Sequence, residues 1–383
     1  MRRLFAASLL ACSFLAAGAS VLDVAEATPV VLDAEHGWID IDPPPAQAAA
    51  AQKAAAQRAA ERAADLANAQ EPAVTLDGVR IVVNANAGSL ADAVSAMEHG
   101  ADGCGLLRTE FLFLDRRAAP SEDEQADEYT RIAQAFGGKP VNVRTMDIGG
   151  DKPIAYLPLP REDNPALGLR GVRTSLANPE LLRTQLRAIA RAAAKTPCRV
   201  LVPMVNEPDE LEALRAHAPE GLPGIGVMIE TPAAALAARA LAKHADFLSI
   251  GSNDLAQYTL AIDRGHPDLA RKLDALHPAV LRMIAATVEG ARAYGRSVCV
   301  CGAMASDVDA LPLLIGLGVQ EISATPTTIP RLKRTVRGLD ARECEQLARR
   351  ALDQENAAAV RDLAAQARGR ARAASQSVPE VPR

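Results

Sequence analysis

The sequence predicts an α/β protein whose main part is a closed (β/α)8 barrel. From Val79 onward, short apolar segments alternate with segments of helical periodicity, and this alternation repeats eight times. Several apolar segments are nearly continuous, as expected of parallel strands that are covered on both faces. Eight strand–helix units in roughly 250 to 290 residues have the usual size of a TIM barrel. An open, doubly wound sheet would also alternate, but no G-x-G-x-x-G motif follows the first strand.

The eight predicted strands are short and lie between longer helical segments. They cover residues 79–86, 103–113, 140–147, 199–205, 225–230, 247–254, 297–302 and 321–326. Among the intervening segments, strong helix formers fill residues 89–100, 121–137, 209–218 and 232–245. Together these elements place the barrel at residues 74–366.

Four other segments surround the predicted barrel. Residues 1–21 carry an apolar run that resembles a signal peptide, and the alternative is the apolar remnant of a domain whose beginning is missing. This run is too short to span a bilayer. Residues 22–43 alternate like a β-hairpin, residues 44–73 form an Ala-rich connecting helix, and residues 367–383 are predicted to be disordered.

Composition limits the classes of function. The 383 residues carry a net charge of −5 and only 3% aromatic residues, which argues against a nucleic-acid-binding surface. The six cysteines lack the paired C-x-x-C spacing of zinc sites. We therefore expect free thiols in a reducing compartment rather than a disulfide framework.

Polar side chains follow five of the predicted strands at the point where each strand ends. In chain order they are Arg108, Thr109, Glu110, Arg144, Asp147, Glu230, Asn253, Asp254 and Cys301. In barrels of this kind, the working residues lie at the C-terminal ends of the strands. The sequence therefore predicts one shared site at that end of the barrel.

Glu230 and Asp254 follow neighbouring strands, so their carboxylates are expected to lie side by side. Two carboxylates suit Mg²⁺, which keeps several waters and takes phosphate oxygens to complete its coordination. The alternative is that each carboxylate forms a salt bridge with a nearby arginine.

Arg108, Arg144 and Arg264 are expected on the opposite side of this site, and Arg170 is a candidate fourth contact. Arginine presents a rigid fork to phosphate or carboxylate oxygens, so several arginines beside a divalent cation indicate a ligand with several negative charges. Asn253 can donate its amide to a carboxylate. The alternative for each arginine is a surface ion pair.

Cys301 ends the strand "VCVC". A thiol at this position can donate a proton or act as a nucleophile. A buried structural cysteine is the commoner outcome, and we expect that for Cys299. A soft-metal site on the C-x-C pair is a weaker alternative, because no further Cys or His lies nearby in the sequence.

Six sequence motifs now support a family resemblance. They are "GLLRTEFLF", "VRTMDIGGDKP", "NPALGLRGVR", "GVMIETPAA", "SIGSNDLAQYTLAIDRG" and "VCGAMASD". In this order and spacing they resemble the phosphoenolpyruvate-binding domain of enzyme I (phosphoenolpyruvate–protein phosphotransferase) of the bacterial sugar phosphotransferase system. The resemblance covers about residues 74–365. The "CGAMASD" form is more similar to the enzyme I segment of fructose-type multiphosphoryl transfer proteins.

The resemblance implies a role for each site residue. Arg108 and Arg144 would bind the phosphate of phosphoenolpyruvate, and Arg170, Asn253, Asp254 and Arg264 would complete the substrate site. Glu230 and Asp254 would hold Mg²⁺, and Cys301 would protonate the enolate to give pyruvate. The implied partners are the histidine-containing phosphocarrier protein and a second copy of the chain, paired through the barrel.

Two features depart from the family pattern. Family members usually carry Glu directly after the Cys-Gly pair, whereas this chain has Ala303, which puts the tuning of Cys301 in doubt. The phospho-accepting His of the family lies in an upstream swivelling domain, of which residues 22–43 resemble the closing hairpin. The resemblance therefore predicts that the chain begins inside a domain and, because phosphoenolpyruvate is cytosolic, that it works in the cytoplasm.

Other hypotheses follow from the same residues. Without its acceptor His, the chain could be inactive alone and act as a regulatory or dimerisation module. A metal-dependent lyase on a pyruvate-type barrel would also use Glu, Asp and Arg, although "TPTTIPRLK" and the Cys301 motif fit enzyme I better. A dikinase-type relative is a further alternative.

Overall fold

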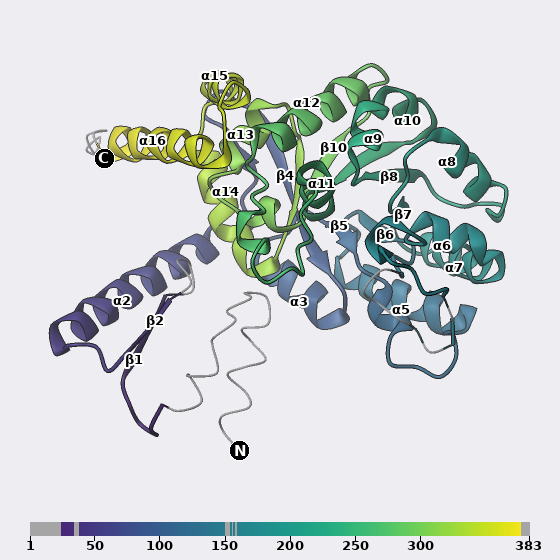
Figure 1. Cartoon of the computed structure of the whole chain (residues 1–383), viewed down its shortest axis with the longest axis horizontal. Helices are drawn as coiled ribbons and strands as arrows, with labels where there is room; N and C mark the ends of the chain where they lie inside the picture. Colours follow the sequence, from purple (N-terminus) through teal and green to yellow (C-terminus); the bar gives the residue numbers. More distant parts are fainter. Residues whose placement is uncertain (1–23, 34–37, 150–153, 155, 158, 377–383) are drawn as a thin grey trace. The chain divides into compact units, whose positions relative to one another are not determined.

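The structure, a computed structural model, describes residues 24–33, 38–149, 154, 156–157 and 159–376 (Figure 1). The segment predicted to be signal-like or a remnant, residues 1–21, lies outside the described residues. The chain divides into two compact units, residues 1–64 and residues 65–383.

The first unit contains two short antiparallel strands, β1 (Val30–Asp33) and β2 (Trp38–Ile41). Val30 pairs with Ile41 and Leu32 with Ile39, so apolar residues gather on one face of this ribbon. The long helix α2 (Pro45–Ala67) begins in this unit and ends just inside the second. It lies in the region for which the sequence predicts a connecting helix.

The second unit is a closed barrel of eight parallel strands. The strands are β4 (Arg80–Ala87), β5 (Cys104–Leu107), β6 (Val141–Arg144), β7 (Cys198–Val202), β8 (Ile225–Ile229), β9 (Phe247–Gly251), β10 (Val298–Cys301) and β11 (Glu321–Ala324). Each strand pairs with the next in the sequence, and β11 pairs with β4 to close the ring. A two-residue strand, β3 (Ala73–Val74), lies antiparallel to β4. The predicted (β/α)8 barrel is confirmed.

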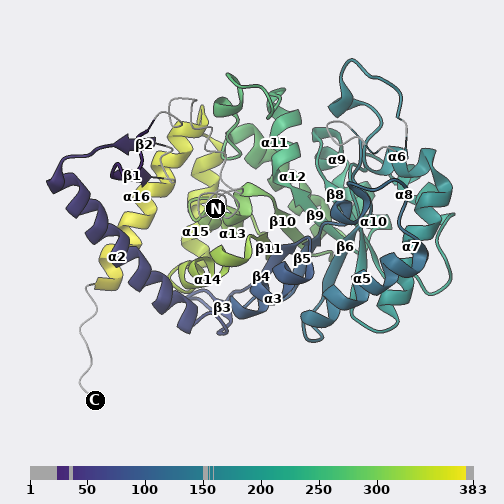
Figure 2. The same ribbon diagram turned by 90° about the horizontal axis from the view of Figure 1, so that it is seen from below.

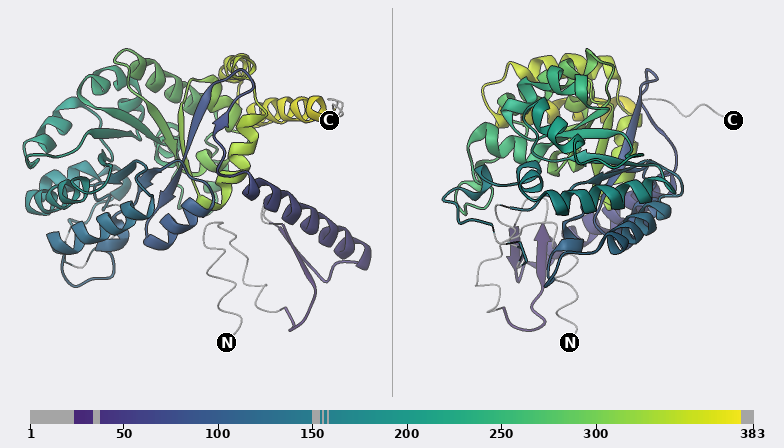
Figure 3. Two further views of the ribbon diagram at one scale, coloured as in Figure 1. Left: turned by 180° about the vertical axis from the view of Figure 1, so that it is seen from behind. Right: turned by 90° about the vertical axis from the view of Figure 1, so that its right-hand side faces the viewer.

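Helices surround the strands, as Figure 3 shows from two sides. Between the strands lie α3 (Leu90–Glu98), α4 (Glu110–Phe113), α5 (Glu122–Ala135), η2 (Pro165–Leu167), α6 (Val172–Ala177), α7 (Pro179–Ala193), α8 (Pro208–Arg215), α9 (Pro232–Leu236), α10 (Ala238–His244), α11 (Ser252–Leu260), η3 (Ala270–Lys272), α12 (Pro278–Arg292), η4 (Ala303–Ser306) and α13 (Leu311–Gly316). After β11 follow η5 (Pro326–Thr328), α14 (Ile329–Arg337), α15 (Ala341–Leu352) and α16 (Ala357–Gln376). In the chain α9 follows β8 and α11 follows β9, and Figure 2 shows α9 next to β8.

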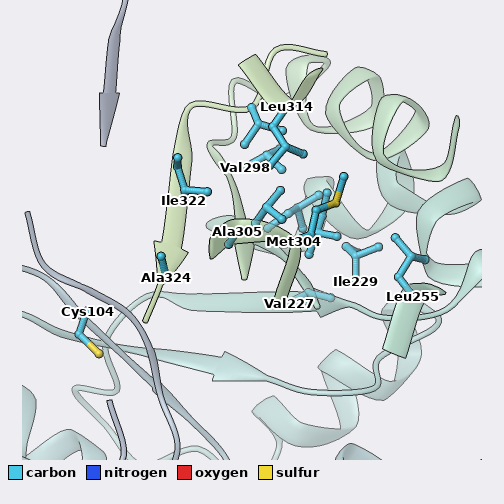
Figure 4. Close-up of a cluster of buried hydrophobic side chains, with 14 of the residues drawn as sticks. Cys104, Val227, Ile229, Leu255, Val298, Met304, Ala305, Leu314, Ile322 and Ala324 are labelled. Carbon is cyan, nitrogen blue, oxygen red and sulfur yellow. The ribbon is translucent and has the colours of Figure 1, made fainter. Parts of the chain in front are cut away.

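The main hydrophobic core lies between the strands and these helices. Figure 4 shows part of it, with Val298 of β10 beside Leu314 of α13 and Met304 of η4. These side chains are less than 4% exposed, so the segment that follows β10 is fixed by burial on its outer side. Cys301 is the last residue of β10 and directly precedes this segment, so its position is fixed as well.

Seven of the eight predicted strands end before their predicted last residue, and in two of them the difference changes where site residues lie. The predicted strand 103–113 stops at Leu107, and residues 110–113 form a helical turn. The predicted strand 247–254 stops at Gly251, so Asn253 and Asp254 lie in the first turn of α11. In both places buried polar side chains follow the strand, and hydrogen bonds to neighbouring segments hold them.

The end of the chain also differs from the prediction, because α16 continues to Gln376, inside the range predicted to be disordered. Among the described residues, no helix combines the length and the apolar character that a membrane crossing requires.

Candidate active site

A cavity of about 290 Å³ lies at the C-terminal ends of the strands. The structure brings all eight predicted site residues to its lining: Arg108, Arg144, Arg170, Glu230, Asn253, Asp254, Arg264 and Cys301. Glu110 and Asp147 also line it, so four guanidinium groups and four carboxyl groups share one space. The closed barrel explains this convergence, because neighbouring parallel strands all point their C-terminal ends to the same mouth.

The segments that follow β5 and β6 are bound to each other by buried hydrogen bonds. Thr109 Oγ1 donates to the Arg144 carbonyl at 2.9 Å. Glu110 Oε1 accepts from Arg144 Nη2 and from the Asp147 amide, both at 3.0 Å. Glu110 is 3% exposed, and these bonds compensate the cost of burying its charge.

Arg144 is held among carboxylates. Its Nη2 contacts Glu110 and its Nη1 lies 3.3 Å from Asp147 Oδ2. Burial alone would lower the pKa of Arg144, but the charges of Glu110, Asp147 and Glu230 raise it above the ordinary value. The guanidinium is therefore permanently charged. Its buried Nε has no hydrogen-bond partner among the residues that the structure describes.

Arg170 links two of the site carboxylates. Its Nε and Nη2 contact both oxygens of Asp147 at 3.3 and 3.2 Å, and its Nη1 contacts Asp254 Oδ1 at 2.7 Å. Nη1 also donates to Tyr258 Oη at 3.2 Å, and Tyr258 in turn contacts the Ala166 carbonyl. Most N–H groups of the Arg170 guanidinium are thus already bonded to other residues of the protein.

The two predicted metal ligands have different surroundings. Asp254 forms ion pairs with Arg170 and, at 3.6 Å, with Arg264. Glu230 is 1% exposed, and its Oε2 accepts from the Met204 amide at 2.9 Å. Burial first, and then the charges of Asp254 and Asp147, raise the pKa of Glu230 to about 8.

Gly251 is required beside Glu230. A Cβ at this position would lie 2.7 Å from Glu230 Cγ and Oε1, which is closer than real Cβ contacts allow. The glycine at the end of β9 therefore leaves room for the carboxylate that follows β8.

A hydrogen bond from a backbone amide fixes the orientation of the Asn253 side chain. Its Oδ1 accepts from the Ala303 amide at 2.9 Å, so the Nδ2 group is left to donate to other partners. The turn that makes this possible contains Gly302, whose φ of +91° favours glycine. A Cβ there would also lie 2.4 Å from Ser252 Oγ. The side chain at position 303 is exposed and takes no part in this bond.

Cys301 lies between the cavity and a small apolar cluster. The cluster contains Leu106, Leu201, Met228, Phe247 and Cys301 itself. Burial, followed by the nearby charge of Glu230, raises the pKa of Cys301 to about 11. At neutral pH the group is therefore a protonated thiol, which suits a proton donor better than a nucleophile. Cys299, one layer away on the same strand, is also buried, as expected.

The lining residues fit a divalent cation. Among the described residues, no group of three or more His, Cys, Asp or Glu side chains is arranged as a metal centre. Mg²⁺ needs only one or two protein carboxylates when a phosphorylated ligand completes its coordination. Glu230 and Asp254 could supply such a pair, and a bound cation would offset the burial that raises the pKa of Glu230.

The sequence did not assign a role to Glu110, Asp147 or Tyr258. Glu110 and Asp147 were visible as polar residues after strands, but their function as partners of Arg144 and Arg170 depends on side-chain packing. Tyr258 lies one helical turn after Asp254 and faces Arg170, and that spacing was the only available signal.

Comparisons with known proteins show the family to which the chain belongs. Residues 62–341 match the family described as PEP-utilising enzyme, PEP-binding domain. A multiphosphoryl transfer protein of Xanthomonas campestris pv. campestris is 47% identical over 94% of this chain and 44% of its own length. Phosphoenolpyruvate-protein phosphotransferases are 43% identical in Haloferax volcanii (94% of this chain, 65% of the relative) and 40% identical in Haemophilus influenzae (87% and 60%). The chain thus spans between about two-fifths and two-thirds of these relatives.

Proposed function

Because the chain belongs to the family of phosphoenolpyruvate-utilising enzymes, through their phosphoenolpyruvate-binding domain, we propose that its cavity binds phosphoenolpyruvate for transfer of the phosphoryl group to a protein histidine. The observation that carries the proposal is the meeting of four guanidinium groups, four carboxyl groups and one protonated thiol in a single cavity. The chain would be the substrate domain of enzyme I of the sugar phosphotransferase system.

The arginines account for the binding of a small, highly charged ligand. Arg108 and Arg144 would bind the phosphate, where fixed guanidinium charges stabilise the group in transfer. Arg264 and the Nδ2 group of Asn253 would bind the carboxylate. Arg170, which is bonded mainly to Asp147 and Asp254, would act by holding Asp254 in place as well as by its charge.

Charge balance supports a cation that enters with the ligand. The four guanidinium groups of the lining share the cavity with four carboxyl groups, of which Glu230, with a pKa of about 8, is mostly protonated at neutral pH. A ligand with several negative charges still needs further compensation. Enzymes of this family use a metal, and here Glu230 and Asp254 would hold Mg²⁺. When bound, Mg²⁺ would offset charge on the phosphate and on the enolate oxygen.

Cys301 would complete the reaction. When the bond between phosphorus and the enol oxygen breaks, the electron pair stays on that oxygen and the phosphoryl group passes to the acceptor nitrogen. The enolate then takes a proton at its terminal carbon from the Cys301 thiol, which gives pyruvate and a thiolate that is reprotonated by solvent. A thiol with a pKa of about 11 still carries this proton at neutral pH.

The proposed partners follow from the same chemistry. The phosphoryl acceptor would be a histidine of a separate domain, which would pass the group to the histidine-containing phosphocarrier protein. We also propose that two copies of the chain pair through the barrel, and that the protein works in the cytoplasm, where phosphoenolpyruvate is found.

Calorimetry with Mg²⁺ and phosphoenolpyruvate tests the binding step. We expect saturable binding that requires both components and that falls at least roughly a hundredfold in Arg144→Ala, because a buried charged contact to phosphate is lost. Unfolding curves show whether the variant is folded. Unchanged affinity in a folded Arg144→Ala variant would contradict the assigned pocket. Transfer is then measured with an acceptor domain added in trans, and binding without any transfer would favour a regulatory module.

A further inference from the structure

We propose that Gln185, which lies outside the cavity, is a positioning residue for Arg144. Gln185 belongs to α7 and is 2% exposed. Its Oε1 accepts from the Met146 amide at 2.9 Å, and its Nε2 donates to Thr109 Oγ1 at 3.2 Å and to Tyr129 Oη at 3.1 Å. One buried side chain thus joins the segments that follow β5 and β6 to helix α5.

Gln185 holds the backbone on both sides of Thr145. It binds the Met146 amide directly, and through Thr109 it reaches the Arg144 carbonyl, to which Thr109 Oγ1 donates at 2.9 Å. Arg144 and Asp147 project from this short segment into the cavity. Their direction therefore depends on the two backbone groups that the Gln185 network fixes.

The direction of every hydrogen bond in this network is determined. The Met146 amide can only donate and the Arg144 carbonyl can only accept. Gln185 must therefore present its oxygen to Met146 and its NH₂ group to Thr109, which leaves the Thr109 hydroxyl free to donate onward. Tyr129 accepts from Gln185 and donates to Gln125 Oε1 at 3.1 Å. A side chain at position 185 that cannot both accept and donate would therefore interrupt this network of hydrogen bonds.

The location of Gln185 suits a role in positioning Arg144 rather than a direct role in the reaction. It does not line the cavity, and it touches neither Arg144 Nη1 nor Arg144 Nη2. Its effect is to keep the strand end in one position, and a shift of about 1 Å in a binding group can cost a hundredfold in function. This inference rests on the proposed function, because the position of Arg144 matters through its contact with the ligand.

The test compares two buried glutamines of the same network. Gln125 is fully buried on α5 and bonds Tyr129 and the Pro120 carbonyl, but no hydrogen bond joins it to Thr109 or to Met146 among the described residues. We expect Gln185→Leu to weaken phosphoenolpyruvate binding in the presence of Mg²⁺ by roughly tenfold to a hundredfold. Gln125→Leu should lower stability similarly and leave the affinity near that of the wild type. Equal affinities in the two variants would overturn the proposal.

Gln185→Glu provides a second variant of the same shape. The ionised carboxylate accepts from Met146 but cannot donate to Thr109, whereas the protonated acid can do both. We expect its affinity, relative to wild type at each pH, to recover as the pH falls from 8 to 5.5, while that of Gln185→Leu stays low. A Gln185→Glu affinity that stays as low as that of Gln185→Leu throughout this pH range would overturn the proposal.

Hydrogen exchange at the Met146 amide provides a measurement without ligand. We expect faster exchange of this amide in Gln185→Leu than in Gln125→Leu, and equal protection in both variants would overturn the positioning role. A wild-type chain that binds no phosphoenolpyruvate would contradict the proposed function instead, and the exchange result would still decide whether Gln185 holds the strand end.

Discussion

The two sides of the cavity differ in whether their ionisable side chains contact an oppositely charged partner. We call the carboxylates and guanidiniums that contact one another the paired side: Glu110, Arg144, Asp147, Arg170 and Asp254. The unpaired side is Glu230 and Cys301, which lie against the apolar cluster of Leu106, Leu201, Met228 and Phe247. Both sides are buried, so exposure does not distinguish them.

The difference lies in the partners. On the paired side each carboxylate has a guanidinium partner within 3.2 Å. On the unpaired side burial dominates and raises the pKa of both Glu230 and Cys301. The paired side is therefore suited to fixed charge, and the unpaired side to groups that gain or lose a proton or accept a cation.

Replacement of Cys301 by Ala tests the unpaired side and has the largest expected effect. The variant loses the proposed proton donor but keeps the arginines, so phosphoenolpyruvate affinity should scarcely change. Formation of pyruvate, with an acceptor domain in trans, should slow by roughly 10²- to 10⁴-fold, the usual contribution of a general acid. Cys299→Ala, on the same strand, is the control and should retain the rate. A Cys301→Ala variant as fast as Cys299→Ala would remove the proton-donor role.

Arg170 and Arg264 sharpen the comparison, because both contact Asp254 but differ in burial. Arg170 is 6% exposed at its side chain and Arg264 is 37% exposed. Removal of a buried partner typically costs about 3–5 kcal/mol, and we expect about 3 kcal/mol for Arg170→Ala because Arg144 and Arg264 still contact Asp147 and Asp254. Arg264→Ala should cost at most about 1 kcal/mol.

Urea unfolding of both variants measures these free energies, and calorimetry measures ligand affinity. Arg264→Ala should lose at least roughly tenfold in phosphoenolpyruvate affinity despite its small effect on stability, because a charge-assisted contact with the ligand is lost. Equal destabilisation by the two substitutions would show that the paired side does not depend on burial.

Stability against pH tests the unpaired side again and separates the two carboxylates. The pKa of Glu230 is raised to about 8 from an ordinary value of 4.5, so the folded chain holds this proton more tightly than the unfolded chain. Without metal, the contribution of this residue to stability is therefore present below about pH 4.5 and is lost as the pH rises to about 8, by about 1.4 kcal/mol for each unit of pKa difference.

Glu230→Gln should have a flatter stability profile than the wild type over this pH range when unfolding is measured in the presence of a chelator. Asp254→Asn should flatten the profile only in part, because burial is the first cause of the raised pKa of Glu230 and the charge of Asp254 is the second. If Glu230→Gln keeps the wild-type slope, then Glu230 is not the group that takes up the proton.

Sequence patterns were sufficient to predict the barrel and to predict the residues that meet in the cavity. The alternation of apolar and helical segments fixes the number of strands, and a closed parallel barrel then forces residues after different strands to one mouth. Cys301 and Glu230 follow their strands directly, so their location could be predicted. The length of the predicted strands was less secure, because apolar residues such as Phe111 and Phe113 continue the pattern beyond the point where the chain turns into a helix.

Contacts between side chains could not be predicted in the same way. The sequence shows that arginines and carboxylates share the cavity, but not that Arg170 binds Asp147 and Asp254, or that Glu230 has no guanidinium partner of its own within ion-pair distance among the described contacts. No sequence pattern indicated a role for Gln185, because a single polar residue on an amphipathic helix is usually exposed.

The sequence by itself determined which chemical groups are available and at which end of the barrel they meet, because strand order and periodicity are properties of the chain. Only the tertiary structure decided which of those groups are charged, protonated or held in one orientation. Protonation and orientation depend on burial and on distances of about 3 Å between residues far apart in the chain, and packing alone sets those distances.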